Sequence, residues 1–174
     1  PKPLFHQGTL IDEIRVSFAE GRISEAHAGK GDDALRRILE TDEGSARLGE
    51  VALVPHASPI SDTGILFRNT LFDENASSHI ALGQAYTKCL FDTEGASAEM
   101  LAATGSNTSM IHIDWMICSD KIDLVGLAED GTATPLMRKV AWLCWKCSFQ
   151  NSQRYALRLP SHLSCLHQTL CRFT

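Results

Sequence analysis

Five side chains that commonly bind divalent metal ions fall within three segments of the sequence. Glu50 lies in LGEVALV, Glu74 and His79 lie in DENASSHIALGQAY, and His112 and Asp114 lie in SMIHIDWMI. Carboxylate and imidazole ligands suit Zn, Co, Mn or Mg better than Cu(I) or an iron–sulfur cluster. An acid-rich set of this kind favours a pair of divalent ions that share a carboxylate and activate a water molecule.

The alternating pattern of residues 109–117 predicts a buried strand. In a strand, residues two positions apart point to the same face, so His112 and Asp114 should lie side by side. A lone histidine in an apolar strand can also be an ordinary core residue, and the H-x-D pair alone leaves both interpretations open. Glu50 is harder to explain as a structural residue, because a carboxylate buried unpaired in LGEVALV is costly.

Residues 73–86 are predicted to form a helix with Asp73 as its N-cap. Residues seven positions apart on a helix differ by only about 20° of rotation, so His79 and Tyr86 should share a face. Glu74 falls near the start of this helix, where its carboxylate could simply stabilise the helix N-terminus. Tyr86 could equally be a core or interface aromatic residue.

The remaining sequence predicts an α+β fold, with a mixed β-sheet and packed helices, because strands and helices do not alternate regularly. Glycine-containing turns indicate hairpins, and aspartates before an apolar helical pattern indicate a capped helix. The expected elements are the hairpin 11–28, the helix 34–44 capped by Asp32 or Asp33, the strand 49–55, the loop 56–70 and the hairpin 122–137.

Composition limits the classes of function. The chain has 174 residues, of which 44% are hydrophobic and 21% charged, as in a globular domain of ordinary size. No apolar run approaches the roughly 20 residues of a membrane-spanning helix. The net charge of −5 gives no electrostatic footprint for nucleic acid. We therefore expect no membrane and no nucleic-acid partner, and the lack of a signal-peptide pattern favours the cytoplasm.

The chain divides into two stretches of different character. Residues 143–174 contain four of the six cysteines and no acidic residue. This break predicts a metal-binding catalytic domain at 1–142, followed by an atypical cysteine-rich tail that is loosely ordered. The spacing Cys144-x-x-Cys147 could begin a zinc knuckle, but no second pair follows at the expected distance, so we favour a loosely packed extension.

Four blocks of the sequence resemble signature segments of the thermophilic metalloaminopeptidases, the family of aminopeptidase T, aminopeptidase S and PepS. The blocks are LGEVALVP, SPISDTG, NTLFDENASSHIALGQAY and NTSMIHIDWMI, in this order. The resemblance covers about residues 8–142 and the C-terminal part of the family. It implies the C-terminal domain of a two-domain metalloaminopeptidase, two divalent ions (Zn, Co, Mn or Mg), peptide substrates with a free N-terminus, and a cytoplasmic homodimer.

The resemblance also implies a role for each matched residue. The implied metal ligands are Glu50, which would bridge both ions, and His79, His112 and Asp114. Glu74 would be a ligand or a proton-transferring base, and Tyr86 a ligand or a hydrogen-bond donor to the developing oxyanion. The implied reaction removes N-terminal residues from peptides with a water molecule that two divalent ions activate.

The resemblance is incomplete in one respect. The family has a further ligand glutamate in an E-x-F-T-type segment upstream of the Glu50 block, and the 174 residues do not contain that segment. We therefore expect this chain alone to be a poor enzyme or none. One alternative is a catalytically impaired fragment that acts only by binding or association. Another is a two-metal phosphoesterase, against which the lack of an Arg/Lys cluster near the motifs argues.

Overall fold

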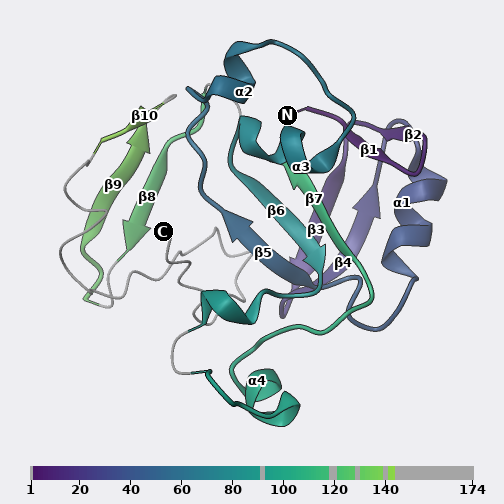
Figure 1. Cartoon of the computed structure of the whole chain (residues 1–174), viewed down its shortest axis with the longest axis vertical. Coiled ribbons are helices and arrows are strands. Elements are labelled where there is room, and N and C mark those ends of the chain that lie inside the picture. Colours follow the sequence, from purple (N-terminus) through teal and green to yellow (C-terminus); the bar gives the residue numbers. More distant parts are fainter. Residues whose placement is uncertain (1, 91–92, 118–120, 128–129, 139–140, 144–174) are drawn as a thin grey trace.

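The described part of the chain forms four small β-sheets joined by short helices (Figure 1). In this computed structural model it comprises residues 2–90, 93–117, 121–127, 130–138 and 141–143. Every strand pair within these ranges is antiparallel. The predicted α+β class is confirmed.

Two hairpins and a helix form the N-terminal part. The first hairpin, which the sequence did not predict, pairs β1 (Leu4–His6) with β2 (Thr9–Ile11). The second pairs β3 (Arg15–Ala19) with β4 (Arg22–His27), as predicted. The helix α1 (Asp32–Leu39) follows and contacts β2 and β4. This part packs against the sheet that carries the candidate ligands.

The ends of α1 differ from those predicted. Its N-cap is Gly31, with φ of +73°, and neither expected aspartate caps it. The Asp32 carboxylate instead accepts hydrogen bonds from the Ala28 N–H and the Arg36 Nε–H, both at 2.8 Å. The helix ends at Leu39, with Glu40 as its C-cap, five residues before the predicted stop at Gly44.

The central sheet has three strands in the order β5-β6-β7. These are β5 (Leu48–Ala52), β6 (His79–Gly83) and β7 (His112–Met116). Between β5 and β6 lie the short helices α2 (Pro59–Asp62) and α3 (Thr70–Asp73) and the 3-10 turn η1 (Glu74–Ala76). Between β6 and β7 lie the 3-10 turn η2 (Thr87–Cys89) and α4 (Ala98–Ala103).

The predicted helix over residues 73–86 is wrong. Helical structure ends at Ala76, and His79–Gly83 is the middle strand of the central sheet (Figure 1). All five residues of this strand are buried. A strand buried on both faces reads as a continuous apolar run, which cannot be told from a buried helix by its periodicity. The Asp73 side chain makes no capping hydrogen bond to the 3-10 turn that follows; its buried carboxylate accepts the N–H groups of Phe67 and Asn69.

The central sheet has one apolar and one polar face. Ile80 and Leu82 of β6 and Trp115 of β7 belong to the hydrophobic core with α1 and the two N-terminal hairpins. The alternate positions of the same strands, among them His79 and Asp114, point to the other face. The core therefore fixes the plane from which the candidate ligands project.

The fourth sheet, in the order β10-β9-β8, lies to the left of the central one in Figure 1. It contains β8 (Leu124–Leu127), β9 (Ala133–Arg138) and β10 (Ala141–Trp142), and the β8–β9 pair confirms the hairpin predicted there. Apart from residue 143, the predicted tail 143–174 lies outside the described residues, so its order and the Cys144-x-x-Cys147 interpretation stay predictions. Within the described ranges, no helix is long and apolar enough to cross a membrane.

Candidate metal centre

A β-bulge in β5 decides which way Glu50 points. Leu48 pairs with Leu82, but the register then shifts and Glu50, not Gly49, faces Ala81. Without the bulge, Glu50 would face Ile80 and point into the core, because side chains alternate between the two faces. The backbone of residues 83–84 approaches Gly49 closely, since a Cβ on Gly49 would lie 2.5 Å from the carbonyl oxygen of Gln84. Glycine at this position permits the bulge that brings the carboxylate to the polar face.

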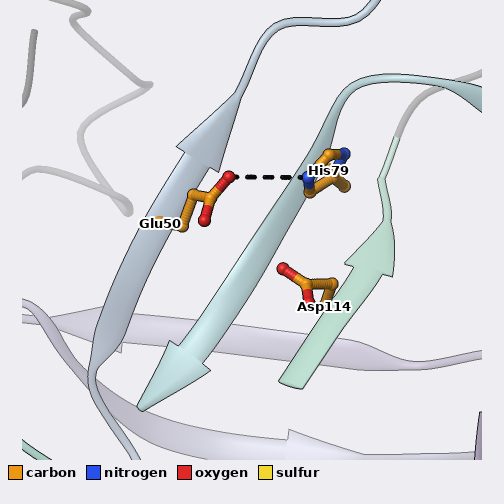
Figure 2. A group of neighbouring side chains, drawn as sticks. All are labelled: Glu50, His79 and Asp114. Atoms are coloured by element: carbon orange, nitrogen blue, oxygen red, sulfur yellow. Dashed lines mark ion pairs between the residues drawn. The ribbon is translucent and has the colours of Figure 1, made fainter. Parts of the chain in front are cut away.

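Four candidate ligands converge on that face from three neighbouring strands. Glu50 Oε1 lies 3.6 Å from His79 Nε2, and Glu50 Oε2 lies 3.4 Å from His112 Nε2. His112 Nε2 lies 3.2 Å from Asp114 Oδ1, which confirms that these two residues share a face. Ligand atoms of Glu50, His79 and Asp114 all lie within 4.8 Å of one another (Figure 2). The small Ala81 side chain, between Glu50 and Asp114 in the register, leaves room for this convergence.

Both histidines are held by backbone carbonyls on the side away from the cluster. His79 Nδ1 lies 3.2 Å from the Ser77 carbonyl oxygen, and His112 Nδ1 lies 2.7 Å from that of Gln84. A carbonyl oxygen can only accept, so in each ring Nδ1 carries a proton and donates it. The Nε2 atoms are therefore the ones presented to the carboxylates. Metal-binding histidines are typically oriented in this way.

The cluster shifts the pKa values of Glu50 and of both histidines. Hydrogen bonds from His112 and then His79 lower the pKa of Glu50 to about 2. Hydrogen bonds to Asp114 and Glu50 raise the pKa of His112 to about 10. Burial works against the charged form of His79, but its bonds to Glu50 and the Ser77 carbonyl raise its pKa overall. Glu50 thus stays ionised, and both imidazoles bind a proton more tightly than usual, as expected of a site with affinity for cations.

Glu74 and Tyr86 complete the neighbourhood. Burial, together with the nearby Asp114 carboxylate, raises the pKa of Glu74 to about 7. The Tyr86 ring lies over the His112 ring, with centroids 4.5 Å apart, and its pKa is raised by burial and then by Asp114. Tyr86 is 53% exposed, so a substrate can reach it. His79 and Tyr86 do not share the helix that the sequence predicted, but both residues lie at the same cluster.

The donor set fits a divalent metal ion. Zinc bonds of about 2.1 Å in tetrahedral geometry separate neighbouring ligand atoms by roughly 3.4 Å. The three nitrogen–oxygen separations in the cluster, 3.2, 3.4 and 3.6 Å, bracket this value. Oxygen and imidazole donors also match the hard to borderline ions Zn, Mn, Co and Mg.

Comparison with known proteins decides the family. Residues 1–142 match the model of a family described as thermophilic metalloprotease (M29). This chain belongs to the thermophilic metalloprotease (M29) family. It is 53% identical over 143 residues to aminopeptidase T of Thermus thermophilus and 48% identical over 144 residues to aminopeptidase AmpS of Bacillus subtilis. Its structure is similar to that of wild-type AmpT from Thermus thermophilus, with a TM-score of 0.76 and 51% identity.

The M29 chain spans about a third of the length of these relatives. The match to aminopeptidase T covers 82% of this chain and 34% of that protein, and the match to AmpS covers 81% and 34%. The structural match covers 83% of this chain and 35% of the AmpT chain. The matched segment is the C-terminal part of the relatives, as the resemblance in sequence implied.

Sequence reasoning missed three supports of the centre in this M29 domain. The bulge at Gly49 had a signal, since a glycine inside a strand pattern indicates a bulge or a close approach of backbone. The carbonyl groups of Ser77 and Gln84 had none, because any residue type supplies a backbone acceptor. The third support, the Asp42 carboxylate that accepts from Ser109 and Met110 ahead of β7, had none either, because these partners lie 67 and 68 positions further along the chain.

Proposed function

We propose that this chain carries the metal centre of a metal-dependent aminopeptidase that hydrolyses N-terminal residues from peptides. The observation that carries the proposal is the convergence of Glu50, His79, His112 and Asp114 on one sheet face, in a member of a metalloprotease family. Aminopeptidase is the name of the related proteins, and extending that activity to this chain is part of the proposal.

The proposed ligands divide between two ions. Glu50 lies between the two histidines, with one oxygen towards each, so we assign it the bridging position. His79 would bind on one side of Glu50 and His112 on the other, with Asp114 within reach of both. When bound, two divalent ions would activate water and polarise the scissile carbonyl. Zn, Co, Mn and Mg are the candidates by ligand type.

Glu74 and Tyr86 are the proposed catalytic residues. Glu74 lies beside Asp114 at the edge of the cluster, where its carboxylate can accept a proton from the attacking water and pass it to the leaving amine. The Tyr86 phenol borders the same cluster and stays protonated, so it can donate a hydrogen bond to the oxyanion that develops on the scissile carbonyl.

The proposal extends to the surroundings of the enzyme. Peptides with a free N-terminus are the proposed substrates, and a homodimer in the cytoplasm is the proposed state; both follow from the family resemblance. The relatives are about three times longer than the matched segment. Turnover by the 174-residue chain is therefore a proposal separate from metal binding, and we expect it to be slow.

The test combines metal binding with hydrolysis of an aminoacyl-anilide by the full chain. We expect the wild type to bind Co²⁺, and any hydrolysis to stop when a chelator is added and to return with Co²⁺ or Zn²⁺. Glu50→Gln should lose both properties, whereas Glu25→Gln, at an exposed site on β4, should keep them. Hydrolysis that survives the chelator contradicts the proposal. Bound metal with no hydrolysis supports the alternative of a domain that acts by binding or association.

A further inference from the structure

The segment that leads into β7 has no regular secondary structure, although it must place His112 accurately. Residues 106–111 connect the end of α4 to β7 as an irregular chain. The Met110 side chain is 78% exposed, so burial of this side chain does not hold the segment in place. Polar contacts with two distant parts of the chain fix it instead.

The first set of contacts comes from Asp42, in the turn after α1. The Ser109 hydroxyl lies 2.9 and 3.0 Å from its two carboxylate oxygens, and the Met110 N–H donates to Oδ2 at 2.6 Å. The Ser45 hydroxyl also donates to Asp42, at 2.9 Å, and Ser45 is fully buried. The Met110 N–H and these hydroxyls lower the pKa of Asp42 to about 2, so its carboxylate is ionised at neutral pH.

The second set comes from Gln84, directly after β6. Its side-chain Oε1 accepts the Ser109 N–H at 3.0 Å, and its backbone N–H donates to the Ile111 carbonyl at 2.7 Å. Its own carbonyl oxygen accepts the His112 Nδ1–H at 2.7 Å. Gln84 therefore both orients the imidazole and grips the residues before it, and Ser109 is the point at which the two sets meet.

We propose that Asp42 is a positioning residue for His112, acting through Ser109 and Gln84 to keep the imidazole Nε2 aimed at the metal centre. The inference rests on the proposed function, because it assigns His112 as a metal ligand. Asp42 touches none of the candidate ligands in the contacts described above. Its effect passes through the backbone of residues 109–111, which carries the Cα of His112.

The substitution Asp42→Asn tests this role, with Asp32→Asn as the matched control. Asp32 also accepts two hydrogen bonds, from the Ala28 N–H and from Arg36 on the same helix, and it also has a lowered pKa, but it anchors α1 to the second hairpin. Asparagine at residue 42 turns one acceptor into a donor that faces other donors. If the substitutions act only by lowering the stability of the fold, both variants should show the same effect. If Asp42 positions His112, only Asp42→Asn should disturb the metal centre.

Two measurements on the full chain are needed. With Co²⁺ as the probe, we expect Asp42→Asn to weaken binding about 10-fold or more, the size of effect seen for groups that orient metal ligands, and Asp32→Asn to stay within about twofold of wild type. In the metal-free wild type, the His112 Nδ1 proton, followed by NMR, should exchange with water much more slowly than that of a free imidazole. Asp42→Asn should remove most of this protection.

The outcomes separate the inference from the proposed function. Equal losses in Asp42→Asn and Asp32→Asn, or wild-type Co²⁺ binding and proton exchange in Asp42→Asn, overturn the positioning role. A wild type that binds no Co²⁺ contradicts the proposed function, while the exchange of the His112 proton still decides the role of Asp42. If Asp42→Asn does not fold, Ser109→Ala removes the hydroxyl link with a smaller change and must give the same two effects, or the inference fails.

Discussion

Substituting Gly49 by alanine should damage both the fold and the metal centre. A Cβ at this position would lie 2.5 Å from two backbone oxygens, those of Gln84 and Gly83, which cannot move away as a side chain could. Alanine in a strand normally gains about 0.5–1 kcal/mol over glycine, whereas an extra carbon in a well-packed site costs about 1–3 kcal/mol. The net expectation is a loss of roughly 1–2 kcal/mol in the free energy of unfolding.

Gly126→Ala is the control for Gly49→Ala. Gly126 also lies in a strand, but its added Cβ would meet only the flexible Leu136 side chain, at 3.2 Å from Cδ1. In urea, the unfolding midpoint of Gly49→Ala should fall by roughly 0.5–1 M, and that of Gly126→Ala should change little. Because the bulge aims Glu50, Co²⁺ binding should also weaken at least about 10-fold in Gly49→Ala. Equal stability and equal Co²⁺ affinity in the two variants would refute the reasoning.

Three further predictions concern the cluster itself. Glu50→Gln should abolish tight Co²⁺ binding, because an amide is a poor bridge between cations, and Glu25→Gln is the control. Wild-type affinity in Glu50→Gln would exclude the bridging role. Glu74→Gln should lower chelator-sensitive hydrolysis at least about 100-fold with metal content preserved; equal loss of metal would make Glu74 a ligand and not a proton carrier. His112 has a raised pKa of about 10 in the metal-free cluster, so a metal ion must displace its proton. The apparent affinity should therefore rise with pH between 6 and 9, by up to about 10-fold per pH unit for each displaced proton; a flat profile by calorimetry would contradict this.

The candidate ligands could be predicted from local spacing only where the secondary structure was read correctly. The alternation in SMIHIDWMI identified β7 and therefore the shared face of His112 and Asp114, which lie in contact. The expected N-cap at Asp73 led to a helix prediction that included His79, but this residue lies on a strand. The residue was still identified, because its type and the surrounding motif, not its periodicity, pointed to metal binding.

The assembly of the centre could not be predicted from the sequence. A regular β5 would send Glu50 into the core, and only the register shift at Gly49 brings it to the polar face. The register depends on which strands pair, and the residues of β5 pair with residues of β6 that lie 27 to 34 positions further along the chain. For the same reason the Asp42–Ser109 contact, between residues 67 positions apart, leaves no local signal.

The aspartate at residue 32 shows the limit of capping rules. An aspartate before an apolar helical pattern predicts an N-cap, but Asp32 lies in the first turn and bonds to the Ala28 N–H instead. Gly31, in the left-handed region, takes the cap position. An aspartate side chain can hydrogen-bond to several nearby backbone groups, and which of them it contacts depends on the folded structure.

The central claim is that three strands bring one metal-binding cluster together, and the number of metal ions held per chain tests it most directly. The full chain and Asp114→Asn should be dialysed against Zn²⁺ and then against metal-free buffer, with zinc and protein measured by elemental analysis. The account predicts that the wild type keeps at least one ion per chain and that Asp114→Asn releases it. A wild type that keeps none, or an Asp114→Asn variant that keeps as much as the wild type, would contradict it.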